Sequence, residues 1–196
     1  MPELPEVETT VRGLEPLLLG QRIATLTLHR SDLRRPFPVD LVQRMVGATV
    51  TGLSRRAKYG LIQTDRDDVM IFHLGMSGRW RTDIAGAEKH DHLVIETAGG
   101  RRMALNDPRR FGSVDLVSGD AQSSFAPFRA LGPEPLSDGF DGDVLAAAFA
   151  GRSAPVKTLL LDQRIVAGLG NIYVCEALHM AGIAPTMAGR DVPLSR

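Results

Sequence analysis

Short runs of β-type sequence between residues 48 and 117 constrain the fold more than any other feature of the chain. A further run at residues 21–29 precedes them, in which Ala24, Leu26 and Leu28 alternate with polar residues. Turn-rich stretches separate the later runs, which lie at residues 48–54, 59–64, 69–74, 92–97, 102–105 and 112–117. Many short strands at this close spacing are typical of an antiparallel β-sandwich.

A helical pattern precedes the strands. Val7, Val11, Leu14 and Leu18 recur at helical spacing and predict an amphipathic helix that ends before Gly20. A second, short helix is predicted at residues 40–46, between the first strand and the later ones.

The sequence changes in character after Ser118. Polar or Pro/Gly-rich segments at 118–124 and 132–142 are typical of a linker and of loops. Helices are predicted around and beyond them, at residues 125–131, 143–150, 155–161 and 171–181. We therefore predict an α+β protein, with an antiparallel β-sandwich and an N-terminal helix at residues 1–124 and a mostly helical domain at residues 125–196.

The charge of the chain is balanced in total but clustered along the sequence. The 23 basic and 23 acidic side chains give a formal net charge of zero. All the basic residues except Lys58, Lys89 and Lys157 are arginines, whose planar fork matches a phosphate group. Arginine richness also follows from a GC-rich genome, but adjacent arginines at 34–35, 55–56, 101–102 and 109–110 are compatible with binding to the backbone of DNA or RNA.

Cys175 is the only cysteine, which excludes an internal disulfide and a multi-cysteine metal site. It shares a predicted helix face with Ile172 and Leu178, so we expect it in the core. The acidic N-terminus does not resemble a signal peptide, and no apolar run reaches membrane-spanning length. We expect a soluble, cytoplasmic protein without a membrane partner.

The N-terminus carries residues suited to covalent chemistry. Removal of Met1 leaves Pro2 as the first residue, with a secondary amine that can attack an aldehydic or sugar carbon and form an iminium. Glu3 is an adjacent carboxylate that can move the protons. The structural alternative is a helix start, with Pro5 in the first turn and Glu6 near the positive end of the helix.

Three loops carry residues suited to contact with nucleic acid. The first is a basic corner that contains Lys58, the second presents Met76 between glycines, and the third contains Arg109, Arg110 and Phe111. An apolar side chain on a glycine-rich turn, and an aromatic ring beside arginines, suit a protein that extrudes a base and fills the gap left behind. Solvated or ion-paired turns, with Met76 in the core, are the structural alternatives.

Two further segments are suited to phosphate. His90 and His92 form a His-x-His pair, but the region offers too few further ligands for a metal, so we expect a structural or phosphate-contacting role. Residues 168–171 bring glycine amides and Asn171 to a predicted helix N-terminus, where an anion is stabilised.

Seven motifs, in this order along the chain, closely resemble the bacterial formamidopyrimidine-DNA glycosylase family. They are PELPEVE at 2–8, RAKY at 56–59, HLGMSG at 73–78, KHDH at 89–92, DPRRFG at 107–112, LGPEPL at 131–136 and GNIY at 170–173. The resemblance implies a catalytic β-sandwich domain followed by a DNA-binding helical domain with a helix–two-turns–helix element. The predicted turn at residues 162–170 fits inside that element.

The resemblance also implies a bifunctional base-excision repair enzyme. Its partner is double-stranded DNA that contains oxidised purines, such as 8-oxoguanine and formamidopyrimidines, or abasic sites. Pro2 is implied as the nucleophile that attacks C1′ of a flipped nucleotide and forms a Schiff base. Glu3 is implied to handle the proton at the sugar oxygen, and Lys58 to assist β-elimination.

Further residues match the family's DNA contacts. Met76, Arg110 and Phe111 match the family residues that fill the space in the base stack left by the flipped nucleotide. Residues matching contacts to backbone phosphates are His90, Arg109 and Asn171, joined by Lys157. Arg152 falls in a segment where the family carries DNA-contacting lysines.

The chain departs from the family after the helical domain. Family members continue into a C-terminal zinc finger with four cysteines and an arginine that assists δ-elimination, whereas this chain stops at Arg196 without them. We therefore expect no zinc or other cofactor in this chain, the start of a helix at residues 189–196, and a monomer. We also expect impaired lesion excision, with weak chemistry at an already opened abasic site.

Two alternatives stay open at this point. One is a DNA-binding remnant without catalytic activity. The other is a specificity for oxidised pyrimidines, like that of endonuclease VIII.

Overall fold

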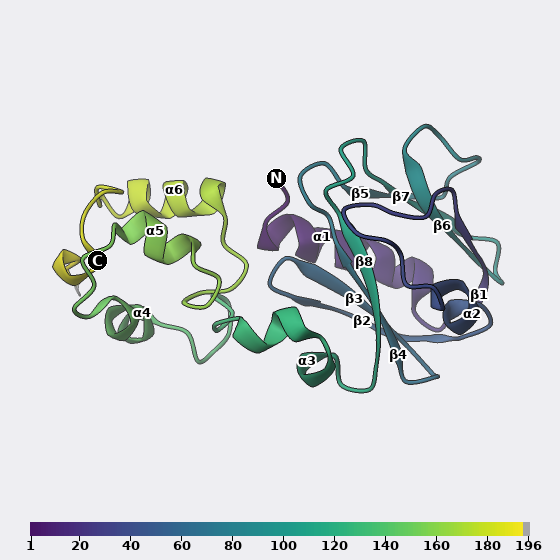
Figure 1. Ribbon diagram of the computed structural model, residues 1–196, viewed down its shortest axis with the longest axis horizontal. Coiled ribbons are helices and arrows are strands. Elements are labelled where there is room, and N and C mark those ends of the chain that lie inside the picture. Colours follow the sequence, from purple (N-terminus) through teal and green to yellow (C-terminus); the bar gives the residue numbers. More distant parts are fainter. Residues whose placement is uncertain (194–196) are drawn as a thin grey trace. The chain divides into compact units, whose positions relative to one another are not determined.

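The computed structural model describes residues 1–193, apart from the side chain of Gln122. The chain divides into two compact units, Met1–Phe125 and Ala126–Arg196, and each encloses its own hydrophobic core. Figure 1 shows both sheets and α1 in the first unit, and α4, α5 and α6 in the second. The predicted α+β class, with a β-sandwich followed by a mostly helical part, is confirmed.

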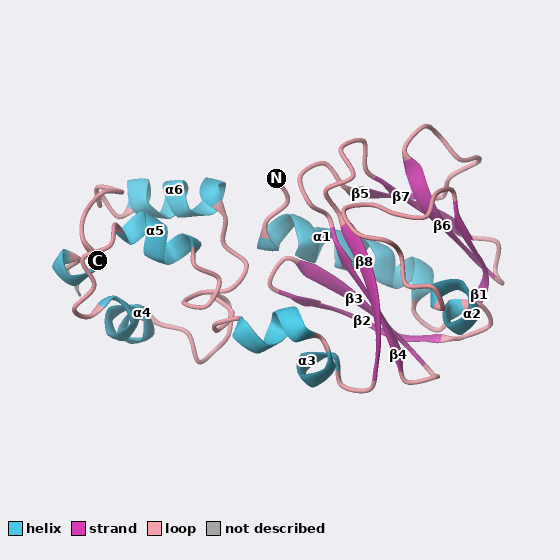
Figure 2. Cartoon of the chain, viewed as in Figure 1, coloured by secondary structure: helices cyan, strands magenta, loops and turns pink. Residues whose placement is uncertain are grey.

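Two four-stranded antiparallel sheets form the sandwich of the first unit (Figure 2). One sheet has the order β1-β6-β7-β5 and consists of β1 (Ile23–Leu28), β5 (Arg79–Thr82), β6 (Asp91–Thr97) and β7 (Arg102–Asn106). The other has the order β2-β3-β4-β8 and consists of β2 (Val50–Arg56), β3 (Tyr59–Thr64), β4 (Asp68–His73) and β8 (Ser113–Ser118). Side chains from both sheets form one core, which includes Ile62, Met70, Phe72, Leu93 and Ile95.

Strand β5 is not predicted by the sequence pattern, because its four residues are mostly polar and none is fully buried. It forms through pairing with β7 and through Trp80, which packs edge-on against Phe72 with the ring centres 5.5 Å apart. Both contacts are made with residues outside β5, on β7 and β4, so the local propensity of this segment does not report them.

The predicted apolar face of β1 is wrong at its first residues. Ala24 is exposed, whereas Ile23 and Leu26 are buried. The pairing of β1 with β6 shifts register between Ile23 and Thr25. Such an irregularity adds a residue to one strand and so moves the alternation of side chains from one face to the other.

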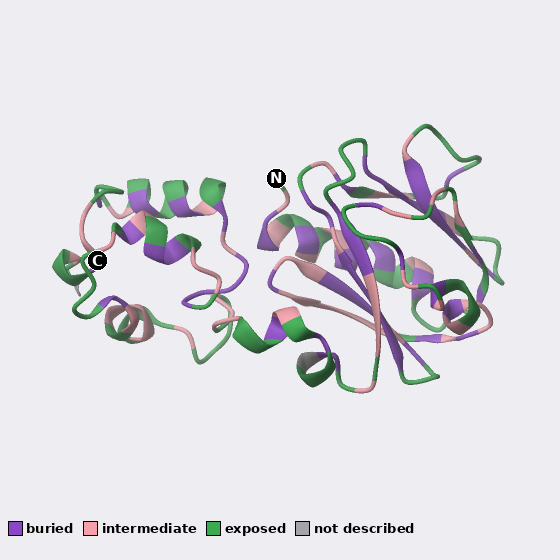
Figure 3. Cartoon of the chain, viewed as in Figure 1, coloured by how far each residue is buried: buried purple, intermediate pink, exposed green. Residues whose placement is uncertain are grey.

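Helix α1 (Leu4–Leu18) packs against strands of both sheets. Its apolar stripe is buried as predicted, and it contacts β2 and β3 of one sheet and β5 of the other. Buried residues recur along α1 and along the strands of the sandwich (Figure 3). The helix begins at a capping box, in which Glu6 Oε2 accepts a hydrogen bond from the Glu3 N–H at 2.8 Å. Residues just after the N-terminus are thereby fixed on the sandwich.

Two short helices complete the first unit. Helix α2 (Leu41–Met45) lies where it is predicted. Helix α3 (Ala121–Ser124) replaces the polar linker predicted at 118–124. It forms next to Asp120, whose carboxylate accepts a hydrogen bond from the Ser123 N–H at 3.1 Å, as a capping residue does.

The second unit is mostly helical, and its longer helices lie close to their predicted positions. They are α4 (Gly142–Phe149), α5 (Val156–Leu161) and α6 (Asn171–Met180). The helix predicted at 125–131 is a 3₁₀ helix, η1 (Ala126–Ala130). In the segment 189–196 the structure has a 3₁₀ turn, η2 (Gly189–Asp191), and residues 194–196 lie outside the described residues. No helix within residues 1–193 is long and apolar enough to cross a bilayer.

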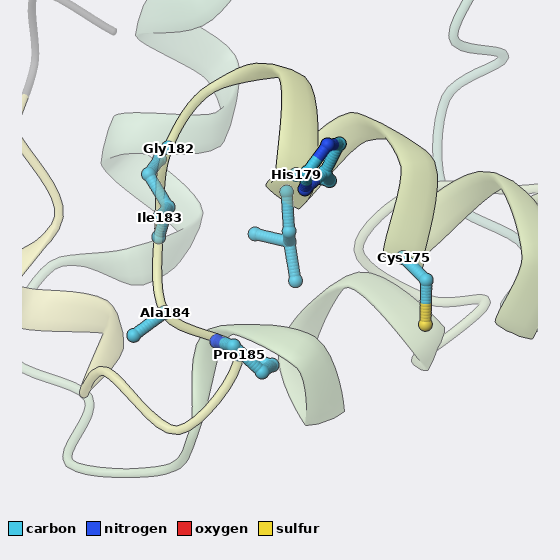
Figure 4. A pocket seen from close by; sticks show the side chains of 7 residues that line it. Cys175, His179, Gly182, Ile183, Ala184 and Pro185 are labelled. Atoms are coloured by element: carbon cyan, nitrogen blue, oxygen red, sulfur yellow. The ribbon is translucent and has the colours of Figure 1, made fainter.

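The predicted burial of Cys175 is wrong. Cys175 and Ile172 are exposed, and the buried side of α6 is formed by Val174 and Leu178. Figure 4 shows Cys175 and His179 on α6, where they line a pocket together with the segment that follows the helix. Apolar residues lie on several sides of α6, so their spacing alone does not select a face. Contact with α5 supplies part of that selection.

His73, at the end of β4, is enclosed by other side chains of the first unit. Its ring centre lies 4.8 Å from that of Tyr59, and its Nδ1 accepts a hydrogen bond from the Gly75 N–H at 3.0 Å. Burial, followed by the nearby positive charge of Lys58, lowers the pKa of His73 to about 4. The imidazole is therefore neutral at pH 7, with its proton on Nε2.

We expect the first unit to lose stability as the pH falls from about 6.5 toward about 4. In that range the unfolded His73 binds a proton and the folded one does not, so acidification favours unfolding. The free energy of unfolding should fall by about 3 kcal/mol for a shift of this size. Urea denaturation followed by the fluorescence of Trp80, the single tryptophan, measures this loss at neutral and acidic pH.

A matched pair of variants isolates the contribution of His73. In His73→Gln a side-chain oxygen can still accept from the Gly75 N–H, and most of the extra acid sensitivity should disappear. The exposed His29→Gln should keep the pH dependence of the unmodified chain. An acid sensitivity that is the same in His73→Gln and in the unmodified chain contradicts this assignment.

Candidate active site and nucleic-acid interface

The N-terminal residues lie at the start of α1, on the surface of the first unit. Pro2 is partly exposed, and Glu3 is 1% exposed. One turn further along, Glu8 Oε2 accepts a hydrogen bond from Arg55 Nε at 2.8 Å, which ties α1 to the end of β2. Hydrogen bonds from Arg12 and Arg55 lower the pKa of Glu8, so this carboxylate stays charged and keeps the tie at neutral pH. The helix and its first residues are thus fixed to the second sheet.

Lys58 lies in the tight turn between β2 and β3. Ala57 before it adopts a positive φ of 51°, and its carbonyl accepts a hydrogen bond from Arg55 Nη1 at 2.9 Å. Burial lowers the pKa of Lys58, and the negative charge of Glu3 partly opposes that effect. A lowered pKa increases the fraction of neutral amine, which is the form that can accept a proton.

The structure brings Glu3 and Lys58 together, as an active site that uses both requires. The negative charge of Glu3 acts to raise the pKa of Lys58, and the positive charge of Lys58 acts to lower that of His73. His73 belongs to the same cluster but was not predicted as a site residue. The sequence signals this residue only in part, because a histidine in a glycine-rich motif does not reveal that its ring will be partly buried near a lysine.

Met76 and Phe111 are the exposed apolar tips of two neighbouring loops. Their residues are 41% and 44% exposed, so both side chains are accessible to a binding partner. The guanidinium carbon of Arg109 lies 4.8 Å from the centre of the Phe111 ring, a cation–π contact. Of the two readings of Met76 from the sequence, the exposed tip is the one that the structure shows.

The two loops touch closely at their backbones. Gly75 has a positive φ of 62°, and a Cβ on it would lie 2.3 Å from the carbonyl carbon of Phe111. A Cβ on Gly112 would lie 2.8 Å from the carbonyl oxygen of His73. Only glycine fits at Gly75, because any other residue meets both the strain and the clash.

His90 and His92 differ in environment. His90 is partly exposed with a positive φ of 74°, whereas His92 is buried and its Nε2 lies 2.9 Å from the Asp107 carbonyl oxygen. A carbonyl can only accept, so His92 carries a proton on Nε2 and has a structural role. Within residues 1–193 no group of three or more His, Cys, Asp or Glu side chains is arranged to hold a metal.

In the second unit, Asn171 is exposed in the first turn of α6. The turn before it, at 162–170, is organised by Gln163, whose amide was not predicted to matter. Its Nε2 donates to the Leu169 carbonyl at 2.8 Å, and its Oε1 accepts from the Gly168 N–H at 2.9 Å. Arg164 pairs with Asp162 at 2.7 Å and lowers the pKa of that carboxyl to about 2.

The two remaining candidates in the second unit are basic. Lys157 is partly exposed on α5, and Arg152 is exposed in the segment that follows α4. The Arg152 carbonyl accepts a hydrogen bond from the Arg190 N–H at 3.0 Å, which fixes the backbone from which this arginine projects.

Comparison with known protein families gives two matches that together cover most of the chain. Residues 1–114 match the model of the formamidopyrimidine-DNA glycosylase N-terminal domain. Residues 131–196 match the model of the formamidopyrimidine-DNA glycosylase H2TH domain.

Individual proteins agree with these matches. The chain is 69% identical over 196 residues to formamidopyrimidine-DNA glycosylase of Sphingopyxis alaskensis, covering 100% of this chain and 73% of that protein. It is 70% identical over 191 residues to the enzyme of the same name from Rhizorhabdus wittichii, covering 97% and 71%. A complex of Lactococcus lactis Fpg with DNA containing an abasic site is similar at a TM-score of 0.90 and 35% identity, covering 98% of this chain and 72% of that one.

A second Lactococcus lactis complex, of an Fpg mutant with DNA containing Fapy-dG, has a TM-score of 0.90 and 36% identity, covering 99% and 72%. Identity at this level over the whole length, with the same fold, does not arise between unrelated chains. This chain belongs to the formamidopyrimidine-DNA glycosylase family.

Proposed function

We propose that this chain excises oxidised purines from double-stranded DNA and cleaves the strand at the resulting abasic site, in base-excision repair. The observation that carries the proposal is the convergence of Glu3 and Lys58 beside the start of α1, where Pro2 is partly exposed. The names of the relatives and the damaged DNA in the Lactococcus lactis complexes support the substrate class. The protein acts on DNA in the bacterial cytoplasm as a monomer.

Pro2 supplies the nucleophile once Met1 has been removed. Its nitrogen lone pair attacks C1′ of the flipped nucleotide, and the C1′–N bond to the damaged base breaks with its electron pair on the base. The proton on the attached Pro2 nitrogen passes to the departing base. Glu3 donates a proton to the ring oxygen as the C1′–O bond breaks and the sugar opens, and C1′ and nitrogen become an iminium. Burial of Glu3 within a capped helix start holds the carboxyl in place for that transfer.

Lys58 removes a proton from C2′ of the iminium, and the electron pair expels the 3′ phosphate in β-elimination. Its lowered pKa supports this assignment, because a neutral amine is needed before it can accept the proton. The negative charge of Glu3 opposes part of this lowering of the Lys58 pKa.

Met76, Arg110 and Phe111 fill the space that the flipped nucleotide vacates. The exposure of Met76 and Phe111 supports this role, since apolar tips at the surface are suited to enter between bases. Arg110 directly precedes Phe111 in the chain and has a positive φ of 57°. A guanidinium at that place can donate hydrogen bonds to the base opposite the lesion.

Phosphate contacts come from both units. In the first unit they are made by His90 and by Arg109, whose guanidinium lies over the Phe111 ring. In the second unit they are made by Arg152, Lys157 and Asn171, which are exposed or partly exposed. Asn171 lies in the first turn of α6, where backbone N–H groups and the helix dipole favour an anion.

Borohydride trapping on a duplex that contains an abasic site tests the role of Pro2. The chain lacking Met1 should form a covalent adduct, because reduction converts the iminium to a stable amine. Peptide mapping by mass spectrometry should place the adduct on Pro2. A matched chain with a retained N-terminal extension, in which the Pro2 nitrogen is an amide, should form none.

The same assay separates the alternatives. No adduct from a chain shown to lack Met1 leaves the DNA-binding remnant as the explanation. Faster excision of oxidised pyrimidines than of 8-oxoguanine from matched duplexes supports endonuclease VIII-like specificity instead.

Replacing Lys58 should separate strand cleavage from adduct formation. Lys58→Arg keeps the positive charge but cannot lose its proton, so we expect β-elimination to slow by about 10²- to 10⁴-fold while the trapped adduct persists. In the unmodified chain the cleavage rate should rise with pH as Lys58 deprotonates, and that rise should be absent in Lys58→Arg. The exposed Lys89→Arg is the control. Equal cleavage rates and pH profiles in Lys58→Arg and the control refute this role.

A further inference from the structure

Asp107 is a fully buried carboxylate that takes no part in the chemical steps above. It is 0% exposed and directly follows β7. Its Oδ1 accepts a hydrogen bond from Ser77 Oγ at 2.6 Å, and its Oδ2 accepts one from the Gly112 N–H at 2.8 Å. A buried charge needs such donors, because without them its loss of hydration is not offset.

The backbone of Asp107 is bonded as well. Its N–H donates to the His90 carbonyl at 3.0 Å, and its carbonyl accepts from His92 Nε2 at 2.9 Å and from the Arg110 N–H at 3.2 Å. One residue therefore joins three segments: the loop with Met76, the segment with His90, and its own loop with Phe111.

The Ser77 side chain connects the Met76 loop to the Asp107 carboxylate, and the direction of its hydrogen bonds is fixed. Its hydroxyl oxygen also accepts from the Arg109 N–H at 3.2 Å. A hydroxyl has one proton to donate, and a carboxylate can only accept, so that proton points to Asp107. Hydrogen bonds to a charged acceptor are stronger than neutral ones. The Met76 loop is thereby connected to the loop of Arg109 and Phe111 at two points.

The connection also holds an unfavourable backbone in place. Arg110 has a positive φ of 57°, a conformation that a residue with a side chain seldom adopts. It lies between two hydrogen bonds to Asp107, from the Arg110 N–H and from the Gly112 N–H. Outside this turn, the Gly112 carbonyl accepts from the Arg34 N–H at 3.1 Å.

We propose that Ser77 and Asp107 are positioning residues that join Met76 and Phe111 into one rigid wedge before DNA is bound. The inference rests on the proposed function of these two side chains in filling the vacated stack. Opening a stacked duplex has a free-energy cost of its own. If the two loops moved independently, ordering both tips would add an entropic cost to the free energy of DNA opening. A joined pair is already ordered, so this cost is avoided.

The test uses a duplex with a stable tetrahydrofuran abasic analogue and 2-aminopurine opposite it. Entry of the wedge changes the stacking, and so the fluorescence, of 2-aminopurine without any bond being broken. Ser77→Ala removes the hydroxyl and leaves the Gly112 N–H bonded to Asp107. We expect the concentration of protein needed for half of the fluorescence change to rise about ten- to a hundredfold, the effect of losing one hydrogen bond to a charged group.

Two matched variants accompany it. Ser77→Thr keeps a hydroxyl and should restore most of the response. Ser54→Ala removes the hydroxyl of another partly buried serine, which accepts a hydrogen bond from Gln63 Nε2 at 3.1 Å, and should behave as the unmodified chain. Borohydride trapping on single-stranded abasic DNA, which needs no wedge, should be unchanged in Ser77→Ala.

The outcomes separate this inference from the proposed function. An unaltered fluorescence response in Ser77→Ala overturns the inference, as does an equal loss of single-strand trapping, which indicates general damage to the fold. No response from the unmodified chain also overturns it, because the wedge then does not enter DNA. A normal response without any trapped adduct from the unmodified chain removes the catalytic proposal and leaves the positioning role supported.

Discussion

The burial of one face of α1 against both sheets is the interaction on which the other features of the first unit depend. The helix places Leu4, Val7, Val11, Leu14 and Leu18 in the core. Burying five such side chains contributes on the order of several kcal/mol, far more than any single polar contact nearby. Because the capped helix start directly follows Pro2, this apolar packing also fixes the chain's N-terminal residues. The Arg55–Glu8 ion pair then connects α1 to β2, the strand that leads into Lys58.

Electrostatics at the site follow from that packing. Burial lowers the pKa values of both Lys58 and His73, and the negative charge of Glu3 opposes the effect at Lys58. Desolvation thus disfavours two positive charges in the same small region. His73 stays neutral and accepts a hydrogen bond from the Gly75 N–H. The pKa of Lys58 is lowered, so its ammonium group loses a proton more easily. The same physical cause therefore keeps His73 neutral at pH 7 and makes the Lys58 amine easier to deprotonate.

In the loops with Met76 and Phe111, hydrogen bonds between polar groups hold exposed apolar side chains in position. Two large side chains are exposed at the surface, where the hydrophobic effect does not hold them. Their positions come instead from a buried carboxylate, a serine and glycines at places of close backbone approach. The turn with Gln163 in the second unit uses the same principle, since its amide side chain bonds the Leu161 carbonyl before the turn and the Gly168 N–H and Leu169 carbonyl near its end.

The sequence by itself determined the class of fold, the apolar stripe of α1, most strands and the identity of the family, because these depend on local periodicity and on ordered motifs. Tertiary structure decided the rest. Strand β5 forms only through pairing with β7, the face of β1 depends on a register shift with β6, and the exposure of Cys175 depends on which side of α6 packs inward. The sequence also proposed Pro2, Glu3, Lys58, Met76 and Phe111 for the site, but it did not indicate Asp107, Ser77 or His73. A carboxylate, a hydroxyl and an imidazole acquire their roles from partners distant in the chain, and local sequence carries no record of the burial that makes those contacts strong.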